Sequence, residues 1–358
     1  MKKLFSAVLA MTLAVTMLAG CTRQVVVVVS PDTQTPAPVQ SAAPATPAPS
    51  QTPSTTGAVK TGLSMVTGIS SSKDAGEADG VAQADIALVA VTVDDKGVID
   101  SCVIDAIQSK IKFSNQGKIV TDLSTEFASK NELGDAYGMK VASSIGKEWN
   151  QQAAAMAEYA VGKTVAELKG IDVNEKGAPS GADLSSSVTL YIGSFVSGIE
   201  TAVNNAAHLG AQAGDKLSLT SVTTMSKSKD AGEKDGQAQA YATVAAVTTK
   251  GDVVTSCYID AVQANVNFDA TGKITSDLKA PIASKNELGD AYGMKKASGI
   301  GKEWYEQAAA FSAYVTGKTI GEASGIAVTE DGGAGDADLA ASVTVGIGDF
   351  LALIAKAQ

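Results

Sequence analysis

The chain has 358 residues, with 28 basic and 38 acidic side chains, a formal net charge of −10 and a single histidine. This acidic excess repels phosphate backbones, and no basic cluster offsets it, so nucleic acid is not an expected partner. With one histidine and three cysteines, a clustered metal site and a histidine-dependent catalytic triad are not expected either.

The N-terminus has the pattern of an export signal. Lys2 and Lys3 precede an apolar run over 4–18, and Leu18-Ala19-Gly20 leads directly into Cys21. A basic start, a short apolar core and small residues before the cut are typical of a secretory signal peptide. The cysteine at this place resembles a bacterial lipoprotein signal. We therefore expect a signal peptide over 1–20, a lipid on Cys21 as membrane anchor, and a protein on the outer face of the cell membrane.

Residues 21–61 are predicted to be a tether. Seven of the nine prolines lie in this stretch, among Ser, Thr, Ala and Gln residues. Such a composition cannot bury an apolar core and favours a semi-extended chain, which at about 3 Å per residue spans on the order of 100 Å. The tether would let a folded part stand away from the bilayer.

The remainder of the chain is duplicated. The thirteen residues "ASKNELGDAYGMK" occur at 128–140 and again, unchanged, at 283–295, whereas their flanks have diverged. Cys102 and Cys257, like Trp149 and Trp304, hold equivalent places in the two copies. This long period is typical of a whole domain, so we predict two tandem similar domains over 62–208 and 215–358.

Within a copy, strands are expected first and helices afterwards. This order predicts an α+β fold in which helices pack on a small antiparallel sheet. Cys102 and Cys257 lie on apolar strand faces and are expected to be small buried residues, and Trp149 and Trp304 are expected in the core. The elements expected in the first copy are a hairpin over 82–93 and 98–107, a second hairpin over 111–122, a helix over 145–161, a short helix from Thr164 to Gly170, and a last helix from Asp183 past Ile199.

The repeated thirteen residues are the first candidate site. Two glycines four apart, with polar residues between them, indicate a loop or broken helix whose backbone can approach a ligand closely. They either form the wall of a ligand pocket or dock the segment onto its own sheet, and both alternatives stay open at this point. The candidate ligand-binding residues are Lys130, Asn131, Glu132 and Tyr137, with Lys285, Asn286, Glu287 and Tyr292 in the second copy.

The second candidate site lies at 179–195 and 335–350. Ser180-Gly181-Ala182 followed by Asp183 resembles the Ser-Gly-Ala-Thr motif of the FMN-binding domains of bacterial exported electron carriers. In that family the threonine is joined to FMN through a phosphodiester. The resemblance implies FMN as cofactor, redox partner proteins, and a flavin-based electron carrier.

The family's threonine is replaced by Asp183 in the first copy and by Asp338 in the second. A carboxylate offers no hydroxyl and repels phosphate, so covalent attachment is not expected at this position, and FMN held without a covalent bond and a different ligand in the same pocket both stay open. Each aspartate is also expected to cap a helix. Residues that the resemblance places near the cofactor are Gly181, Ala182, Asp183, Ser187 and Thr189, with Asp338, Ser342 and Thr344 in the second copy.

The function expected from these patterns is that of a membrane-anchored extracytoplasmic lipoprotein with two FMN-binding-like domains, acting in electron transfer rather than as an enzyme. The alternative is a surface lipoprotein that binds a ligand or a partner without redox chemistry. Duplication suits this alternative as well, because two linked sites raise avidity without new contacts.

Overall fold

The computed structural model describes residues 57–358, which belong to one compact unit. The predicted signal peptide, Cys21 and nearly all of the tether over 21–61 lie outside the described residues. Within 57–358, none of the helices combines the length and the apolar character that a membrane crossing needs.

Each copy has the same order of elements, with three strands followed by short helices. The first copy contains β1 (Lys60–Gly68), β2 (Gly80–Val93), β3 (Ile99–Phe113), α1 (Lys130–Leu133), η1 (Gly134–Tyr137), α2 (Trp149–Ala160), α3 (Val165–Lys169), α4 (Ala182–Ser185) and α5 (Gly193–Asn204). The second copy contains β4 (Lys216–Thr224), β5 (Gly236–Lys250), β6 (Val253–Phe268), α6 (Lys285–Leu288), η2 (Gly289–Tyr292), η3 (Met294–Lys296), α7 (Trp304–Val315), α8 (Ile320–Ser324), α9 (Ala337–Ala340) and α10 (Gly348–Ala355).

The strands form two antiparallel sheets, in the orders β1-β2-β3 and β4-β5-β6. The hairpin predicted over 82–93 and 98–107 is present as β2 and β3, in which Val91 pairs with Cys102. The α+β prediction, with two similar units of antiparallel strands and helices, is thereby confirmed.

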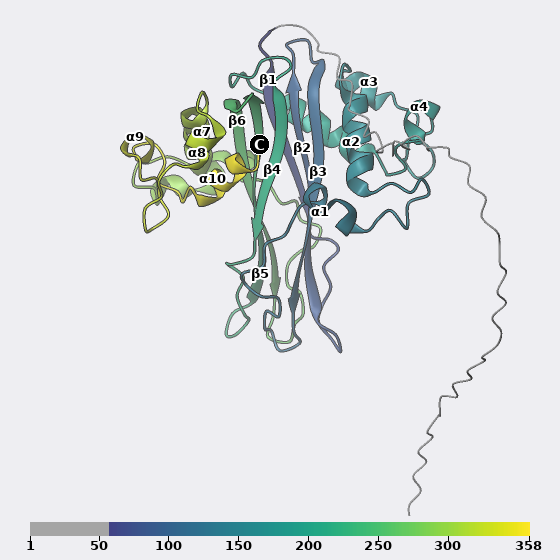
Figure 1. Ribbon diagram of the computed structural model, residues 1–358. Helices are drawn as coiled ribbons and strands as arrows, with labels where there is room; N and C mark the ends of the chain where they lie inside the picture. Colours follow the sequence, from purple (N-terminus) through teal and green to yellow (C-terminus); the bar gives the residue numbers. More distant parts are fainter. Residues whose placement is uncertain (1–56) are drawn as a thin grey trace, which may run out of the picture. The chain divides into compact units, whose positions relative to one another are not determined.

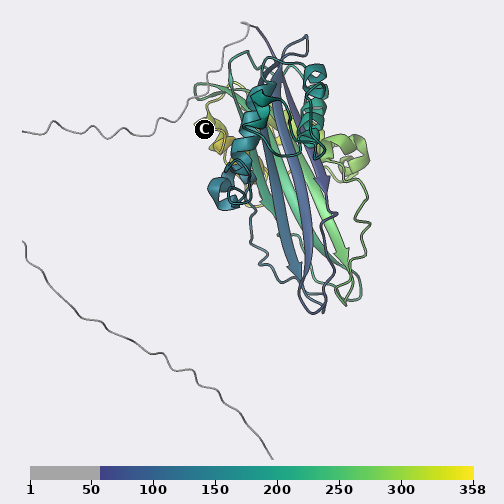
Figure 2. The same cartoon turned by 90° about the vertical axis from the view of Figure 1, so that its right-hand side faces the viewer.

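The two sheets pack face to face, and the helices cover the outer face of each (Figure 1). Residues from both sheets form the apolar layer between them, including Leu63 and Leu88 from the first copy and Val244 and Val262 from the second. Seen from the side of α2, the helices of the first copy lie in front of the strands (Figure 2). The arrangement is therefore helix, sheet, sheet, helix.

This layering explains the sequence of β2. From Leu88 onward both of its faces are buried, because Leu88 and Ala90 face the other sheet while Val89 and Val91 face the helices. Strands buried on both sides read as continuous apolar runs. Nearer its start the strand alternates, with buried Ala82 and Ala84 on one face and Gln83 on the other. Helices cover only one part of the sheet's length (Figure 1).

The two copies contact each other through equivalent residues, as two subunits do around a two-fold axis. The Ala75 N–H donates to the Gly272 carbonyl over 2.8 Å, and the equivalent Ala231 N–H donates to the Gly117 carbonyl over 2.7 Å. The Asp74 carboxylate likewise accepts from the N–H of Ile274, a bond of 2.8 Å. In the second copy the equivalent Asp230 accepts from Ile119 over 2.8 Å.

Two expected elements differ in the structure. The helix predicted from Asp183 past Ile199 is two helices, α4 and α5, separated by the irregular stretch 186–192. In place of a second hairpin over 111–122, β3 runs on to Phe113 and turns, with only an isolated bridge from Phe113 to Ile119.

Other local predictions are confirmed. Helix α3 is capped at its start by the Thr164 side chain and ends at Gly170. Trp149 and Trp304 are buried, each with its ring edge-on to a phenylalanine. Cys257 is buried as expected, whereas Cys102 is only half-buried, and both are free thiols. Burial raises the pKa of each thiol to about 12, so neither is a reactive thiolate.

Candidate functional site

The repeated thirteen residues fold as a broken helix in both copies. In the first, Ser129 caps α1 and forms a capping box with Glu132, and the helix then breaks at Gly134. Gly134 has φ 50° and ψ −125°, a conformation open essentially to glycine alone. The 3₁₀ turn η1 follows and ends at Gly138 with φ 78°. The two glycines are thus required by the backbone path.

Two buried carboxylates fix this segment at its ends. Asp105, only 4% exposed on β3, accepts the Asn131 N–H over 3.0 Å, and burial raises the pKa of its carboxyl. Glu148, 2% exposed before α2, accepts the N–H groups of Met139 and Lys140 over 2.8 Å each. Asp260 and Glu303 make the same bonds in the second copy.

A lysine of the segment packs among aromatic rings. The Lys130 ammonium lies 4.6 Å from the ring centre of Tyr137 and 4.8 Å from that of Trp149. Such contacts stabilise a cation by about 0.5–2 kcal/mol, more where it is desolvated. One face of the Tyr137 ring, a candidate ligand-binding residue, is therefore occupied by the chain's own ammonium group.

The lysine of the second copy is more enclosed. Lys285 is 5% exposed, lies 4.6–4.8 Å from the ring centres of Tyr241, Tyr292 and Trp304, and donates to the Tyr241 hydroxyl over 3.0 Å. Burial lowers the pKa of Lys285 to about 8, although the charge of Asp260 opposes this shift. Tyr241 has no counterpart ring in the first copy, where Asp85 stands in its place.

These contacts dock each segment onto its own sheet, and this docking explains why the thirteen residues are the same in both copies. Asn131 donates its side-chain amide to the Ile104 carbonyl over 3.0 Å, and Glu132 accepts the Ser129 N–H over 2.8 Å in the capping box. Asn286 makes the same amide bond to Ile259, and Glu287 forms the same capping box. Their contact with a cofactor stays a prediction.

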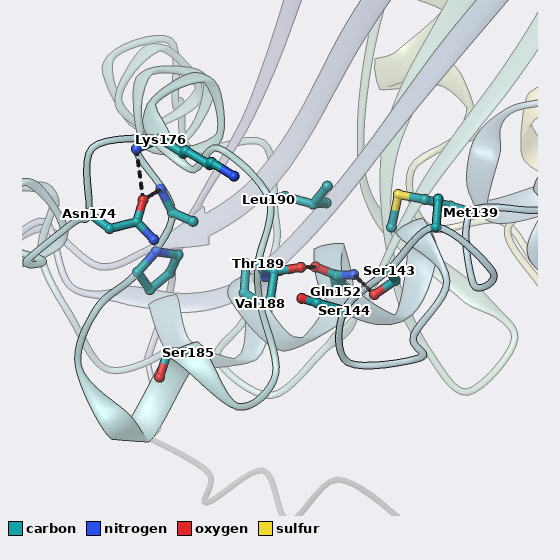
Figure 3. Close-up of a pocket in the computed structure, with 13 residues that line it drawn as sticks. Met139, Ser143, Ser144, Gln152, Asn174, Lys176, Ser185, Val188, Thr189 and Leu190 are labelled. Atoms are coloured by element: carbon teal, nitrogen blue, oxygen red, sulfur yellow. Dashed lines mark hydrogen bonds between the residues drawn. The ribbon is translucent and has the colours of Figure 1, made fainter.

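A groove of about 560 Å³ lies beside this segment in the first copy (Figure 3). One side carries Met139 and Ser143 from the end of the repeated segment and the loop after it, and the other carries Asn174, Lys176 and Pro179. Val188, Thr189 and Leu190 lie between the two sides. The volume is within the range of roughly 300–1,000 Å³ that is usual for small-molecule sites.

Gln152 holds the groove together. This fully buried side chain accepts the N–H of Thr189 over 2.8 Å and its hydroxyl over 3.1 Å, and donates to the Ser143 hydroxyl over 3.1 Å. Gln307 makes the equivalent bonds to Thr344 and Ser298. The Gln152 side chain thus connects Thr189, in the second candidate stretch, to Ser143 in the loop after the repeated segment.

The second candidate stretch, which begins at Pro179, lies next to the groove. Ser185 lines the groove, whereas Gly181, Ala182 and Asp183 are exposed and do not. The expected capping role of Asp183 is wrong, because Gly181 is the N-cap of α4. Asp183 lies instead in the first turn of α4, and its carboxylate accepts the N–H of Leu184 over 3.0 Å. Its carboxylate therefore helps to hold the one-turn helix in place.

The second copy differs at the same point. Asp336 is the N-cap of α9 and accepts the N–H groups of Asp338 and Leu339 over 3.0 Å each, so the expected cap Asp338 is wrong here too. Asp331 stands where the first copy has Lys176. The hydroxyl of Ser187 accepts a bond from Lys147 over 3.1 Å, and the half-buried Ser342 is its equivalent. The second copy is thus the more acidic at this place.

Several residues of the site were not singled out from the sequence. These are the buried polar side chains Asp105, Glu148 and Gln152 and the groove residue Lys176. The first three, like the thirteen residues, are the same in both copies: "VIDA" and "YIDA" contain the aspartate, and "GKEW" followed by "QAAA" contains the other two. The sequence signal that could have found these three residues is a polar side chain that is the same in both copies and lies among apolar residues.

Within residues 57–358 no three His, Cys, Asp or Glu side chains gather so as to hold a metal ion. Comparison with known proteins gives no further assignment: no family model, no curated protein and no solved structure matches the chain.

Proposed function

We propose that the protein is a lipid-anchored extracytoplasmic carrier that binds FMN non-covalently in the groove of the first copy. The observation that supports this proposal is the position of the groove. It joins Met139, the penultimate residue of the repeated segment, to Ser185 and Thr189 of the stretch that resembles an FMN-binding motif. Bound FMN would supply one- and two-electron redox chemistry, and the chain would supply binding and orientation.

Each side of the groove offers a different part of an FMN site. The half-buried Met139 and Leu190 give apolar surface for a flat ring system, and the other apolar lining residues Pro179 and Val188 are buried. The Lys176 ammonium extends toward the space beside Leu190 (Figure 3) and is the cation available to a phosphate. A lysine acts here as a point charge rather than as a bidentate partner.

The second copy is expected to bind FMN less well. Asp331 replaces Lys176, and Asp336, which stands where the first copy has Gly181, adds negative charge near the same place. Like charges disfavour a phosphate dianion. We therefore expect one FMN per chain.

Titration of the purified chain with FMN and, separately, riboflavin tests the proposal, with flavin fluorescence as the readout. Lys176→Asp, which introduces the residue of the second copy, should weaken FMN about tenfold or more, equivalent to about 1.4 kcal/mol, and leave riboflavin unchanged. Lys110→Asp, at an exposed position on β3, controls for net charge. A chain that takes up neither flavin would refute the proposal and favour the alternative of a non-redox ligand-binding lipoprotein.

A further inference from the structure

A second cavity, of about 450 Å³, lies in the other copy and away from the FMN-type motif. Its walls come from β6 and α7, and residues of the joint between the copies, His208 and Leu209, complete it. Ile259, Ala309 and Cys257 supply apolar surface, and the Cys257 thiol is neutral because burial raises its pKa to about 12.

The joint is held over this cavity by specific contacts. The His208 ring bonds the Asp95 carboxylate at 3.0 Å, and Asp95 also pairs with the Lys60 ammonium at 2.8 Å. Gly210 has φ 117°, and a Cβ there would collide with the Thr255 carbonyl of β6. The close approach of the joint to β6 therefore depends on a glycine.

Two of the residues that line the cavity carry buried polar atoms without hydrogen-bond partners. Ser312, 6% exposed on α7, has a buried hydroxyl with no hydrogen-bond partner among the described residues, and it lies beside the Cys257 thiol. The side-chain carbonyl oxygen of Asn286 is buried and unbonded as well, although its amide nitrogen bonds the Ile259 carbonyl. A buried polar atom without a partner costs about 1–3 kcal/mol, which a ligand that bonds to it would recover.

The copies differ where this cavity lies. Tyr258 and Tyr305 line it, and the equivalent residues of the first copy are Val103 and Asn150. Ser312 is Ala157 there. The aromatic rings and the free hydroxyl are therefore particular to the second copy, although the rest of the fold is shared.

We propose that this cavity is a second small-molecule site, which takes a neutral aromatic compound carrying an N–H or O–H donor. Aromatic and aliphatic walls with a few polar atoms are the usual composition of such sites. No Lys, Arg, Asp or Glu side chain lines the cavity, which favours an uncharged ligand. The side-chain carbonyl oxygen of Asn286, a lining residue, has no bonded donor, which favours a ligand that carries one.

N-Phenyl-1-naphthylamine is a suitable probe, since it is neutral, has two aromatic ring systems and one N–H, and becomes fluorescent in apolar surroundings. Titrated into the purified full chain, it should give a saturable rise in fluorescence. Ala309→Trp places a large ring at an exposed α7 position that lines the cavity, and should weaken the probe about tenfold or more. Excess FMN should not displace it.

The duplication supplies a matched control. Ala154 is the equivalent exposed residue of α2, and Ala154→Trp should leave the affinity within about twofold. A second variant, Tyr258→Val with Tyr305→Asn, restores residues that the first copy already accommodates and should also weaken the probe. Non-saturable fluorescence, equal loss in both Trp variants, an affinity unchanged by Ala309→Trp, or displacement by FMN would overturn this second site without bearing on FMN binding.

Discussion

The side chain of Asp260 accepts the backbone N–H of Asn286 over 3.0 Å, a bond that joins the centre of β6 to the start of α6. The same carboxylate accepts the Ala261 N–H over 2.7 Å. It is 6% exposed, and burial raises its pKa to about 6. The ionised form of the Asp260 carboxyl would strengthen these bonds, but burial makes this form unfavourable in the folded protein.

This bond predicts a pH-dependent effect of Asp260→Asn. Between about pH 4 and 6 the folded state keeps a proton that the unfolded state releases. The stability supplied by Asp260 is therefore full below the unfolded pKa and is lost as the pH rises through about 6. Asparagine keeps an acceptor oxygen and has no charge, so the variant should gain up to about 3 kcal/mol relative to the parent between pH 4 and 7.

Urea unfolding at pH 4 and pH 7 measures this difference. The range stays below the pKa of the nearby Lys285, which is about 8, so that the charge of that residue does not change. Asp105→Asn should shift in the same direction, because burial also raises the pKa of Asp105. A free-energy difference that is the same at both pH values would contradict the prediction.

A second prediction concerns the break in the repeated segment. Gly289 has φ 51° and ψ −125°, and a Cβ added there would meet no atom within 4 Å. Any loss of stability in Gly289→Ala must therefore come from the backbone conformation, at about 1–3 kcal/mol. Gly134→Ala should behave alike, since the first copy has the same angles. Thermal or urea unfolding checks both.

Gly76 provides the control. Its Cβ position is equally open, but its φ is not positive, so Gly76→Ala should stay within about 0.5 kcal/mol of the parent. Equal stability of Gly289→Ala and Gly76→Ala would mean that the strained turn does not explain why both copies keep these glycines.

Local features of the fold could be predicted because neighbouring residues determine them. Thr164 and Gly170 limit α3 by capping chemistry, and the β2–β3 hairpin follows from two apolar runs around a polar turn. The single helix expected from Asp183 was wrong for a tertiary reason. Leu184 and Val188 have helical spacing, but the Thr189 N–H bonds the distant Gln152 side chain instead of the helix backbone.

The packing of one sheet on the other could not be predicted from the sequence. Leu88 and Ala90 lie on the face of β2 that packs against the other sheet. In the sequence this second buried face shows only as a continuous apolar run, which does not reveal what covers the face. β1 and β4 were also missed, since Ser, Thr and Gly interrupt their apolar alternation. The docking of the repeated segment on Asp105 depends on a pairing across 26 positions of the chain.

A third prediction concerns the coupling of the two copies. The rings of Phe113 and Phe268 stack with centres 4.3 Å apart, and both are fully buried between the sheets. Either Phe→Ala change should cost about 3–5 kcal/mol. The double variant should cost less than the sum, by about 0.5–3 kcal/mol, because the residues share one contact.

The tryptophans distinguish coupled from independent unfolding of the predicted domains at 62–208 and 215–358. Trp149 belongs to the core of the first copy and Trp304 to that of the second. With Trp149→Phe, fluorescence reports on the second copy alone. In the converse background, Trp304→Phe, the fluorescence of Trp149 reports on the first copy. If the sheets unfold together, Phe113→Ala must lower the urea midpoint by the same amount in both backgrounds. A shift confined to Trp149 would instead mean that each copy unfolds independently and that the shared apolar layer contributes little to the stability of either.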